Sequence, residues 1–308
     1  MRILVTGGAG FIGSNFVHHV LGTHESNEVV TLDALTYAGD RANLEGVLED
    51  PRHEFVEGDV RDYDLVSDLV EDVDAVVNFA AESHVDRSIE GARPFVTTNV
   101  EGTQTLLDAA EEAGVDRFLQ VSTDEVYGQI LDGKFSETDP LGPRNPYAAT
   151  KAGADLLARS FHTTHRLPVL VTRTCNNFGP RQHPEKLIPK FIQNAAAGEN
   201  LPVYGDGSNV REWIYVEDNC RALDLVLRKG EVGEVYNVGS DVEKTNLEVT
   251  KAILDAVDAS EDLIEFVDDR AGHDQRYALE TDKIAALGWV PQYSFEEGLR
   301  RTVEHYLG

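Results

Sequence analysis

Residues 3–13, Ile-Leu-Val-Thr-Gly-Gly-Ala-Gly-Phe-Ile-Gly, decide the fold of this chain. The first four form a short apolar strand, and a helical stretch follows the last glycine. Gly8, Gly10 and Gly13 satisfy the spacing G-x-G-x-x-G, and Gly7, Gly10 and Gly13 also give G-x-x-G-x-x-G. Glycines at these positions allow a tight turn and a close backbone approach, so that a pyrophosphate can sit at the positive N-terminus of the helix. A strand, this turn and a helix in that order predict a dinucleotide-binding unit.

The pattern continues outward from this unit through the first half of the chain. Helical stretches, notably Phe11–Leu21, Pro94–Ala113 and Tyr147–His165, alternate with short apolar runs. We expect strands at Ile3–Thr6, Val29–Leu32, Glu54–Glu57, Ala75–Phe79, Phe118–Val121 and Val169–Thr174. Continuously apolar strands alternating with helices indicate a parallel sheet covered on both faces. The expected fold is therefore α/β, a Rossmann-like doubly wound parallel sheet with a smaller C-terminal lobe.

Two domains are expected. Residues 1–175 form the dinucleotide-binding domain, and residues 176–308 form mainly the substrate-binding lobe, with some later segments returning to the sheet. The two parts are expected to share a cleft.

The end of the second strand indicates which dinucleotide binds. Asp33 lies 20 residues after Gly13, where a carboxylate accepts hydrogen bonds from the adenosine ribose. Because a carboxylate repels a 2′-phosphate, NAD is favoured over NADP. Asp59, after the third strand, either meets the adenine or is simply a turn residue.

Tyr147 and Lys151 are spaced i, i+4 on the helix that Pro146 begins, so they share one face. A phenol with an ordinary pKa near 10 is a poor base at neutral pH. A neighbouring ammonium and a positive nicotinamide ring would both lower that pKa. The pair therefore predicts redox chemistry, although the same spacing also occurs on exposed helix faces.

Asp124 and Glu125 follow the fifth strand and separate two kinds of chemistry. Two carboxylates beside a nicotinamide are not needed for simple hydride transfer. A dehydration needs both, because a protonated carboxyl donates to the leaving hydroxyl while an ionised carboxylate removes a proton from carbon. The alternative is an acidic surface turn.

The composition limits the class of protein. The chain has 308 residues and a formal net charge of −28, which opposes binding to nucleic acid and to anionic membranes. No apolar run approaches the ~20 residues of a membrane helix, and the N-terminus does not resemble a signal peptide. Two isolated cysteines, Cys175 and Cys220, argue against a disulfide framework and a zinc site. We expect a cytoplasmic protein without a metal, adapted to high salt because salt screens its repulsive charge; the alternative is an acidic mesophilic enzyme.

Eight segments resemble the nucleoside-diphosphate-glucose 4,6-dehydratase family, which belongs to the extended short-chain dehydrogenases/reductases. They are MRILVTGGAGFIGS, DALTYAGDRANL, FAAESHVDRSI, STDEVYG, NPYAATKA, CNNFGPRQHPEKLIPKFI, REWIYVEDN and RAGHDQRYALE. The resemblance runs from Met1 to about Leu307 and is most specific at STDEVYG. It implies an NAD-dependent lyase that converts a nucleotide-activated glucose, with dTDP-glucose as the expected substrate, into a 4-keto-6-deoxy sugar for deoxysugar biosynthesis.

The resemblance also implies residue roles. Tyr147, assisted by Lys151, takes the proton of the sugar 4-hydroxyl, Glu125 takes the carbon-5 proton, Asp124 protonates the leaving 6-hydroxyl and Thr123 bonds the 4-oxygen. The implied cofactor residues are Gly7, Gly10, Phe11, Ile12, Gly13, Asp33, Ala34, Leu35, Thr36, Asp59, Val60, Phe79, Ala80, Ala81, Glu82, Ser83, Thr98, Tyr147, Lys151 and Asn177. The implied substrate residues are Ser83, Thr123, Asn176, Lys186, Leu187, Pro202, Val203, Tyr204, Arg211, Asn246, Arg270 and His273.

A homodimer is expected from the same resemblance, through the helices Pro94–Ala113 and Tyr147–His165. Apolar residues that these helices offer include Val100, Leu107, Leu156 and Phe161.

Two other functions share the glycine turn and the Tyr–Lys pair: an NAD-dependent nucleotide-sugar 4-epimerase or uronic-acid decarboxylase, and a silent NAD-sensing regulator. Asp124 and Glu125 argue against the former, and the intact Tyr–Lys pair argues against the latter.

Overall fold

A computed structural model describes residues 1–269 and 272–308 of the chain. Its main sheet has seven parallel strands in the order β10-β6-β5-β4-β1-β2-β3. The strands are β1 (Arg2–Thr6), β2 (Glu28–Asp33), β3 (His53–Glu57), β4 (Ala75–Asn78), β5 (Arg117–Thr123), β6 (Val169–Thr174) and β10 (Val235–Val238). The expected fold class is confirmed, and the six expected strands are all present. The seventh strand, β10, comes from the second half of the chain and pairs with β6.

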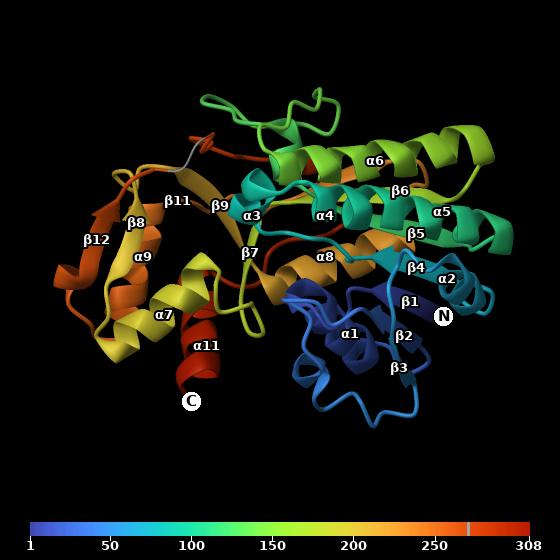
Figure 1. Cartoon of the computed structure of the whole chain (residues 1–308), viewed down its shortest axis with the longest axis horizontal. Helices are drawn as coiled ribbons and strands as arrows, with labels where there is room; N and C mark the ends of the chain where they lie inside the picture. The colour runs from blue at the N-terminus through green and yellow to red at the C-terminus, as the bar shows by residue number, and fades with distance from the viewer. Residues whose placement is uncertain (270–271) are drawn as a thin grey trace.

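Helices cover both faces of this sheet. On one face lie α1 (Phe11–Thr23) and α8 (Val216–Lys229), and on the other α2 (Tyr63–Val70), α5 (Gly102–Ala113) and α6 (Pro146–His165), as Figure 1 shows. Both faces are therefore apolar, which explains the continuously apolar strands in the sequence. None of the helices in the described residues is long and apolar enough to cross a membrane.

Alternation along β1 illustrates how the two cores are built. Ile3 and Val5 belong to the apolar cluster beneath α1 and α8, whereas Leu4 belongs to the cluster beneath α2, α5 and α6. All three side chains are fully buried. The strand order reverses beside β1, because β2 and β3 lie on one side of it and β4, β5 and β6 on the other. In such a sheet, ligands bind in the crevice at the carboxyl ends of the strands next to this point.

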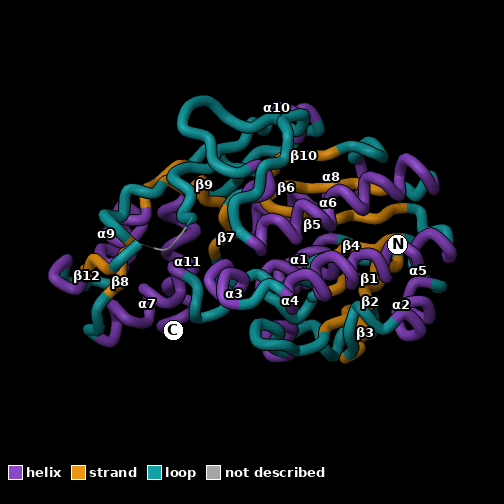
Figure 2. The backbone as a smooth tube through the Cα atoms, turned by 45° about the horizontal axis from the view of Figure 1, so that its top comes forward, coloured by secondary structure: helices purple, strands orange, loops and turns teal. Residues whose placement is uncertain are grey.

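A second lobe lies beside the carboxyl ends of the sheet strands (Figure 2). One of its sheets consists of β7 (Asn176–Phe178), β9 (Val210–Tyr215) and β11 (Glu243–Thr245), and the other of β8 (Leu201–Tyr204) and β12 (Ile264–Val267). Three helices, α7 (Leu187–Ala197), α9 (Asn246–Ala256) and α11 (Phe295–Leu307), contribute to a third apolar cluster with these strands. The remaining short helices are η1 (Arg41–Leu44), α3 (Val85–Glu90), α4 (Arg93–Phe95), η2 (Val96–Glu101), η3 (Asp124–Tyr127), η4 (Glu261–Leu263) and α10 (Asp282–Ala286).

The helical stretch expected at Pro94–Ala113 is not one regular helix. The π-helical segment η2 interrupts it and turns Asn99 into the interior, where that residue is 1% exposed. The Asn99 side chain accepts a hydrogen bond from the Glu82 backbone N–H at 2.8 Å and donates to the Glu82 carbonyl at 3.0 Å. It also donates to the Thr150 hydroxyl in α6 at 2.9 Å. Such π-segments often mark functional sites, and this one fixes the loop after β4 against α6.

Two residues expected at a dimer interface lie instead inside the chain. Leu107 is fully buried and Phe161 is 7% exposed, and both belong to the core between the helices and the sheet. Apolar periodicity gives a core position and an interface position the same pattern, so the sequence could not separate them. Leu156 is 52% exposed and remains available at the surface of α6.

Candidate active site

A cleft of about 1340 Å³ lies between the carboxyl ends of the sheet strands and the second lobe. Single-ligand pockets are commonly 300–1,000 Å³, so this cleft can accept a dinucleotide together with a second ligand. One wall comes from the turns after β1, β2, β3, β4 and β5 together with the start of α6, and we call it the first-half wall. The opposite wall comes from segments between Asn176 and Tyr277, and we call it the second-half wall.

The glycine turn has the geometry that the sequence predicted. Gly7 has a φ of +67°, in the left-handed region that favours glycine. A Cβ on Gly13 would lie 2.2 Å from the Gly7 carbonyl oxygen, so only glycine fits where α1 packs on the turn. The N-terminus of α1 therefore opens onto the cleft with its backbone N–H groups accessible at close range.

Asp33 is held by the backbone of the first-half wall. Its carboxylate accepts hydrogen bonds from the Ala9 N–H at 2.9 Å and from the Leu35 N–H at 2.9 Å. Burial raises the pKa of Asp33, although these backbone hydrogen bonds oppose the shift. The carboxylate lines the cleft at the end of β2, where it was expected. Asp59 also lines the cleft, and its pKa is lowered by hydrogen bonds from Arg61, with which it forms an ion pair at 2.6 Å.

The structure brings nearly all of the expected cofactor residues to the cleft. Leu35 is the exception, because its side chain packs against the apolar core on the α1 side of the sheet. The others that line the cleft are Gly7, Gly10, Phe11, Ile12, Gly13, Asp33, Ala34, Thr36, Asp59, Val60, Phe79, Ala80, Ala81, Glu82, Ser83, Thr98, Tyr147, Lys151 and Asn177.

The five expected catalytic residues meet at one corner of the cleft. Thr123 ends β5, and its hydroxyl donates to Asp124 Oδ1 at 3.1 Å and accepts from the Glu125 N–H at 3.3 Å. The Asn145 amide, which also caps α6, donates to Glu125 Oε2 at 3.1 Å. Lys151 Nζ donates to the Val121 carbonyl oxygen at 2.6 Å. The turn after β5 and the start of α6 are thus joined through side chains of the site.

The charges of this corner are unusual. Asp124 is 2% exposed, and burial together with the Glu125 charge raises its pKa well above the usual range. Its Oδ2 atom has no hydrogen-bond partner in the described residues, which suits a protonated carboxyl aimed at a ligand. Burial lowers the pKa of Lys151 to about 8.

The sequence predicted that Lys151 and a bound nicotinamide ring would together lower the pKa of Tyr147. In the chain by itself, burial raises this pKa, and the charges of Glu125 and Asp124 add to the shift. The Lys151 ammonium donates its hydrogen bond to the Val121 carbonyl oxygen. A phenolate at this position therefore requires a further positive charge.

The second-half wall contributes two cationic side chains, Lys186 and Arg211, and burial lowers the pKa of Lys186. Lys186 begins α7, and its ammonium donates to the Ser83 carbonyl oxygen at 3.1 Å. The Arg211 guanidinium donates to the carbonyl oxygens of Val210 at 2.7 Å and Asp274 at 2.9 Å. Within the described chain neither cation forms an ion pair with a carboxylate, so both can attract an anionic ligand.

The other expected substrate residues fall into two groups. Those that line the cleft are Ser83, Thr123, Asn176, Leu187, Pro202, Val203, Tyr204, Asn246 and His273. His273 Nδ1 lies 2.6 Å from Asp269 Oδ1. The expectation for Arg270 falls outside the described residues.

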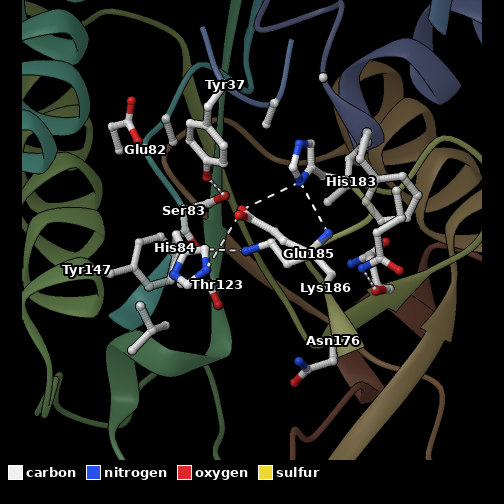
Figure 3. Close-up of a pocket in the computed structure, with 18 of the residues that line it drawn as sticks. Tyr37, Glu82, Ser83, His84, Thr123, Tyr147, Asn176, His183, Glu185 and Lys186 are labelled. Carbon is white, nitrogen blue, oxygen red and sulfur yellow. Dashed lines mark hydrogen bonds and ion pairs between the residues drawn. The ribbon is translucent and has the colours of Figure 1, made fainter. Parts of the chain in front are cut away.

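A polar cluster across the cleft was missed from the sequence. Glu185 lies within ion-pair distance of three side chains, at 2.8 Å from Arg87, 3.7 Å from His84 and 3.7 Å from His183 (Figure 3). Arg87 also lies over the Tyr37 ring at 4.4 Å. This cluster joins the loop after β4 to the segment before α7. Arg87 and Glu185 are 98 residues apart in the sequence, so no local pattern could have revealed their contact.

Comparison with known proteins agrees with this geometry. The family model described as GDP-mannose 4,6 dehydratase matches residues 4–302 of the chain. The chain belongs to this dehydratase family. It is 72% identical over 308 residues to the low-salt glycan biosynthesis protein Agl12 of Haloferax volcanii, covering 100% of this chain and 99% of that protein. It is 52% identical to the dTDP-glucose 4,6-dehydratase of Streptomyces niveus, covering 99% and 93% of the two chains.

A solved member of the family has nearly the same structure. DesIV, the dTDP-glucose 4,6-dehydratase of Streptomyces venezuelae crystallised with NAD and dTDP, superposes with a TM-score of 0.98 at 55% identity. The match covers 99% of this chain and 97% of DesIV. The Rossmann-like architecture and the membership of the extended short-chain dehydrogenases/reductases are thereby confirmed.

Proposed function

We propose that this chain is an NAD-dependent dTDP-glucose 4,6-dehydratase, which removes water from the nucleotide-activated sugar to give its 4-keto-6-deoxy product. The observation that carries the proposal is the meeting of Asp124, Glu125 and Tyr147 in one corner of the cleft. The 52% and 55% identities to enzymes of that name support the same assignment.

NAD fits the first-half wall. The turn from Gly7 to Gly13 suits a pyrophosphate. The turn closes this tightly only with glycine at position 13, because a Cβ there would collide with the Gly7 carbonyl. Asp33 would accept hydrogen bonds from the adenosine ribose, and Lys151 would donate to the nicotinamide ribose. When bound, NAD supplies a hydride acceptor for sugar carbon 4, a hydride donor for carbon 6, and a positive ring that lowers the Tyr147 pKa.

The chain's own residues move the protons. Tyr147 takes the proton of the 4-hydroxyl as carbon 4 is oxidised, and Thr123 donates a hydrogen bond to the 4-oxygen. The resulting ketone makes the carbon-5 proton acidic, and Glu125 removes it. Asp124 gives its proton to the 6-hydroxyl as the carbon–oxygen bond breaks, so that water leaves. When carbon 6 receives the hydride, carbon 5 needs a proton, and Glu125 returns it. The raised pKa of Asp124 suits this role, because an acid must still hold its proton near neutral pH.

The nucleotide diphosphate binds the second-half wall. It is dianionic, and Lys186 and Arg211 offer positive charge: neither forms a close ion pair with a carboxylate in the described residues, although the charges of Glu185 and Glu125 act on Lys186. Tyr204 and Asn246 lie in the same wall and complete the expected nucleotide site. A chain with a net charge of −28 needs such local cations to hold an anion against its own field.

Glu125→Gln tests the proposal. The variant keeps the shape of the side chain but removes the base, so oxidation at carbon 4 should survive while elimination falls ~10²–10⁴-fold. Mixing it with dTDP-glucose should produce absorbance of reduced nicotinamide that decays slowly. Glu248→Gln is the matched control, because Glu248 only caps α9 at the surface and should leave both phases unchanged.

Two results would contradict the assignment. Wild-type turnover by Glu125→Gln would make the acidic pair a surface turn and favour a 4-epimerase or decarboxylase. Failure of the wild-type protein to convert dTDP-, UDP-, CDP- or GDP-hexoses into a product lighter by one water would favour a silent NAD-sensing regulator.

We further propose a homodimer that works in a salty cytoplasm and supplies a deoxysugar for glycan assembly. Ile89, Val96 and Leu156 are 46–52% exposed on neighbouring helical segments, as a dimer interface requires. Cys175 and Cys220 are free and buried, as is usual in a reducing compartment. The net charge and the Haloferax relative support the salt requirement and the glycan role.

Each part of this proposal has a simple check. A monomer in light scattering at molar KCl would contradict the dimer. An unchanged melting temperature at ~0.1 M KCl, where charges interact over ~10 Å instead of ~3 Å, would contradict the salt requirement. Cell fractionation that finds the protein outside the cytoplasm would contradict its location.

A further inference from the structure

Arg173 is a fully buried cation beneath the cleft that the proposed mechanism does not use. It lies in β6 with 0% exposure and is the largest side chain in the core that is this deeply buried. It does not line the cleft. A charge removed from water in this way needs partners on every side, and its partners lie on two different elements of the site.

One side of the guanidinium holds α6. Arg173 Nε donates to Asp155 Oδ2 at 2.8 Å, and Nη2 donates to Asp155 Oδ1 at 3.1 Å. Such a two-pronged contact fixes both the distance and the orientation of the carboxylate. Asp155 is also 0% exposed and lies one helical turn after Lys151 and two turns after Tyr147. The contact therefore fixes the helix that carries the Tyr–Lys pair.

The other side of the guanidinium holds η3. Arg173 Nη1 donates to the Tyr127 hydroxyl oxygen at 2.8 Å, and that hydroxyl donates onward to Asn237 Oδ1 in β10 at 2.8 Å. The Tyr127 ring stacks on Phe135 with centroids 4.8 Å apart. Tyr127 is the last residue of η3, the single turn that contains Asp124 and Glu125. The same cation is thus bonded to both elements that carry reacting groups.

Stability alone is a weak reason for this arrangement. A buried ion pair loses its hydration, and apolar residues of similar size are often equally stable in its place. An apolar contact, however, would not fix the orientation of both elements, whereas directed hydrogen bonds do. Proton transfer depends on such placement, since an error of about 1 Å at the reacting groups costs ~10²-fold in rate.

We propose that Arg173 is a positioning residue that sets the Asp124–Glu125 turn, through Tyr127, against the Tyr147–Lys151 helix, through Asp155. This rests on the proposed dehydratase function. The two contacts have separate consequences. Loss of the Tyr127 contact misplaces Asp124 and Glu125, which carry out the elimination. Loss of the guanidinium misplaces these two residues and also Tyr147 and Lys151.

Tyr127→Phe and Arg173→Lys test the two contacts in single-turnover reactions with dTDP-glucose and the NAD-loaded enzyme. In Tyr127→Phe, the rise of reduced-nicotinamide absorbance should stay within about twofold of the wild type, while its decay slows ~10–100-fold. In Arg173→Lys, both phases should slow, because lysine cannot reproduce the planar fork. Tyr236→Phe is the matched control. Tyr236 lies in β10, away from the site, and the variant loses a hydroxyl that accepts a hydrogen bond from the Glu231 N–H at 2.8 Å.

A second measurement does not depend on turnover. Hydrogen exchange followed by mass spectrometry should show faster exchange of backbone amides in residues 122–128 of Tyr127→Phe, and additionally in residues 146–155 of Arg173→Lys. Tyr236→Phe should change neither segment.

The outcomes separate this inference from the proposed function. Wild-type protein that fails to dehydrate the sugar overturns the function, while the exchange pattern still tests the positioning role. If Tyr127→Phe shows wild-type phases and exchange, or merely the same loss of melting temperature as Tyr236→Phe, the network is structural only and the inference is wrong.

Discussion

The two walls of the cleft reach the same end, binding anions in an acidic protein, by different means. The first-half wall uses backbone: the glycine turn opens the N-terminus of α1, and Asp33 is fixed by two N–H groups of that same wall. The second-half wall uses side chains, with Lys186 and Arg211 held by carbonyl oxygens. Carbonyl partners orient a cation without cancelling its charge. In the proposed function, the first-half wall carries out the chemistry and the second-half wall supplies affinity.

The largest test of this division is Tyr147→Phe. The phenol is the proposed first proton acceptor, so its loss should lower kcat by ~10³–10⁴-fold with little change in KM. Neither reduced nicotinamide nor solvent deuterium at carbon 5 should appear in this variant, as stopped-flow absorbance and mass spectrometry will check. A larger change in KM than in kcat would show that the first-half wall serves binding instead.

The first-half wall was predictable because it is local. A strand, its turn and the next helix are adjacent in sequence, so Gly13, Asp33 and Asp124 could be placed from spacing. The residues of the second-half wall were predicted from family resemblance only. A single lysine or arginine in a sequence, such as Lys186 or Arg211, is more often a surface residue. Glu185 and Arg173 were missed, because their partners lie 98 and 46 residues away and are brought near by packing.

The partner of Lys151 was missed for a related reason. The i, i+4 spacing placed Lys151 beside the phenol, but it could not show which atom the ammonium prefers. In the structure that atom is the Val121 carbonyl oxygen on β5, 30 residues away. Helical spacing gives the face on which a side chain lies, and the neighbouring element decides its hydrogen bond.

Arg211→Met sharpens the comparison from the opposite wall. Methionine keeps much of the apolar stem, but it removes charge-assisted hydrogen bonds to a diphosphate, so KM should rise about 10- to 100-fold. The value of kcat should stay within about threefold, because no reacting atom is touched. Arg300→Met is the control, since Arg300 only pairs with Glu304 on the surface of α11. A fall in kcat as large as that in Tyr147→Phe would contradict the proposal that the second-half wall supplies affinity and takes no part in the chemistry.

The smallest effect concerns stability and compares two carboxylates. Asp124 belongs to the first-half wall, and burial together with the Glu125 charge raises its pKa, although the Arg211 charge opposes the shift. Asp224 lies in α8, away from the cleft. Burial alone would raise its pKa, but the hydrogen bonds from His24 and Arg228, with His19 nearby at 3.6 Å, lower it to about 2.

The two pKa shifts predict opposite pH dependences. A carboxyl with a raised pKa in the folded state adds stability at low pH, and that stability is lost as the pH rises through the folded pKa. Asp124→Asn should therefore melt like the wild type near pH 4 and become more stable than it by ~2–5 °C near pH 8.

Asp224 has a lowered pKa, so its contribution is present above the unfolded pKa and lost as the pH falls toward about 2. Asp224→Asn should accordingly be less stable than the wild type near pH 8, by a margin that shrinks in acid. Calorimetry of both variants across this range measures the difference directly. If Asp124→Asn is also destabilised near pH 8, then Asp124 is a stabilised carboxylate there, and it cannot be the acid that protonates the leaving hydroxyl.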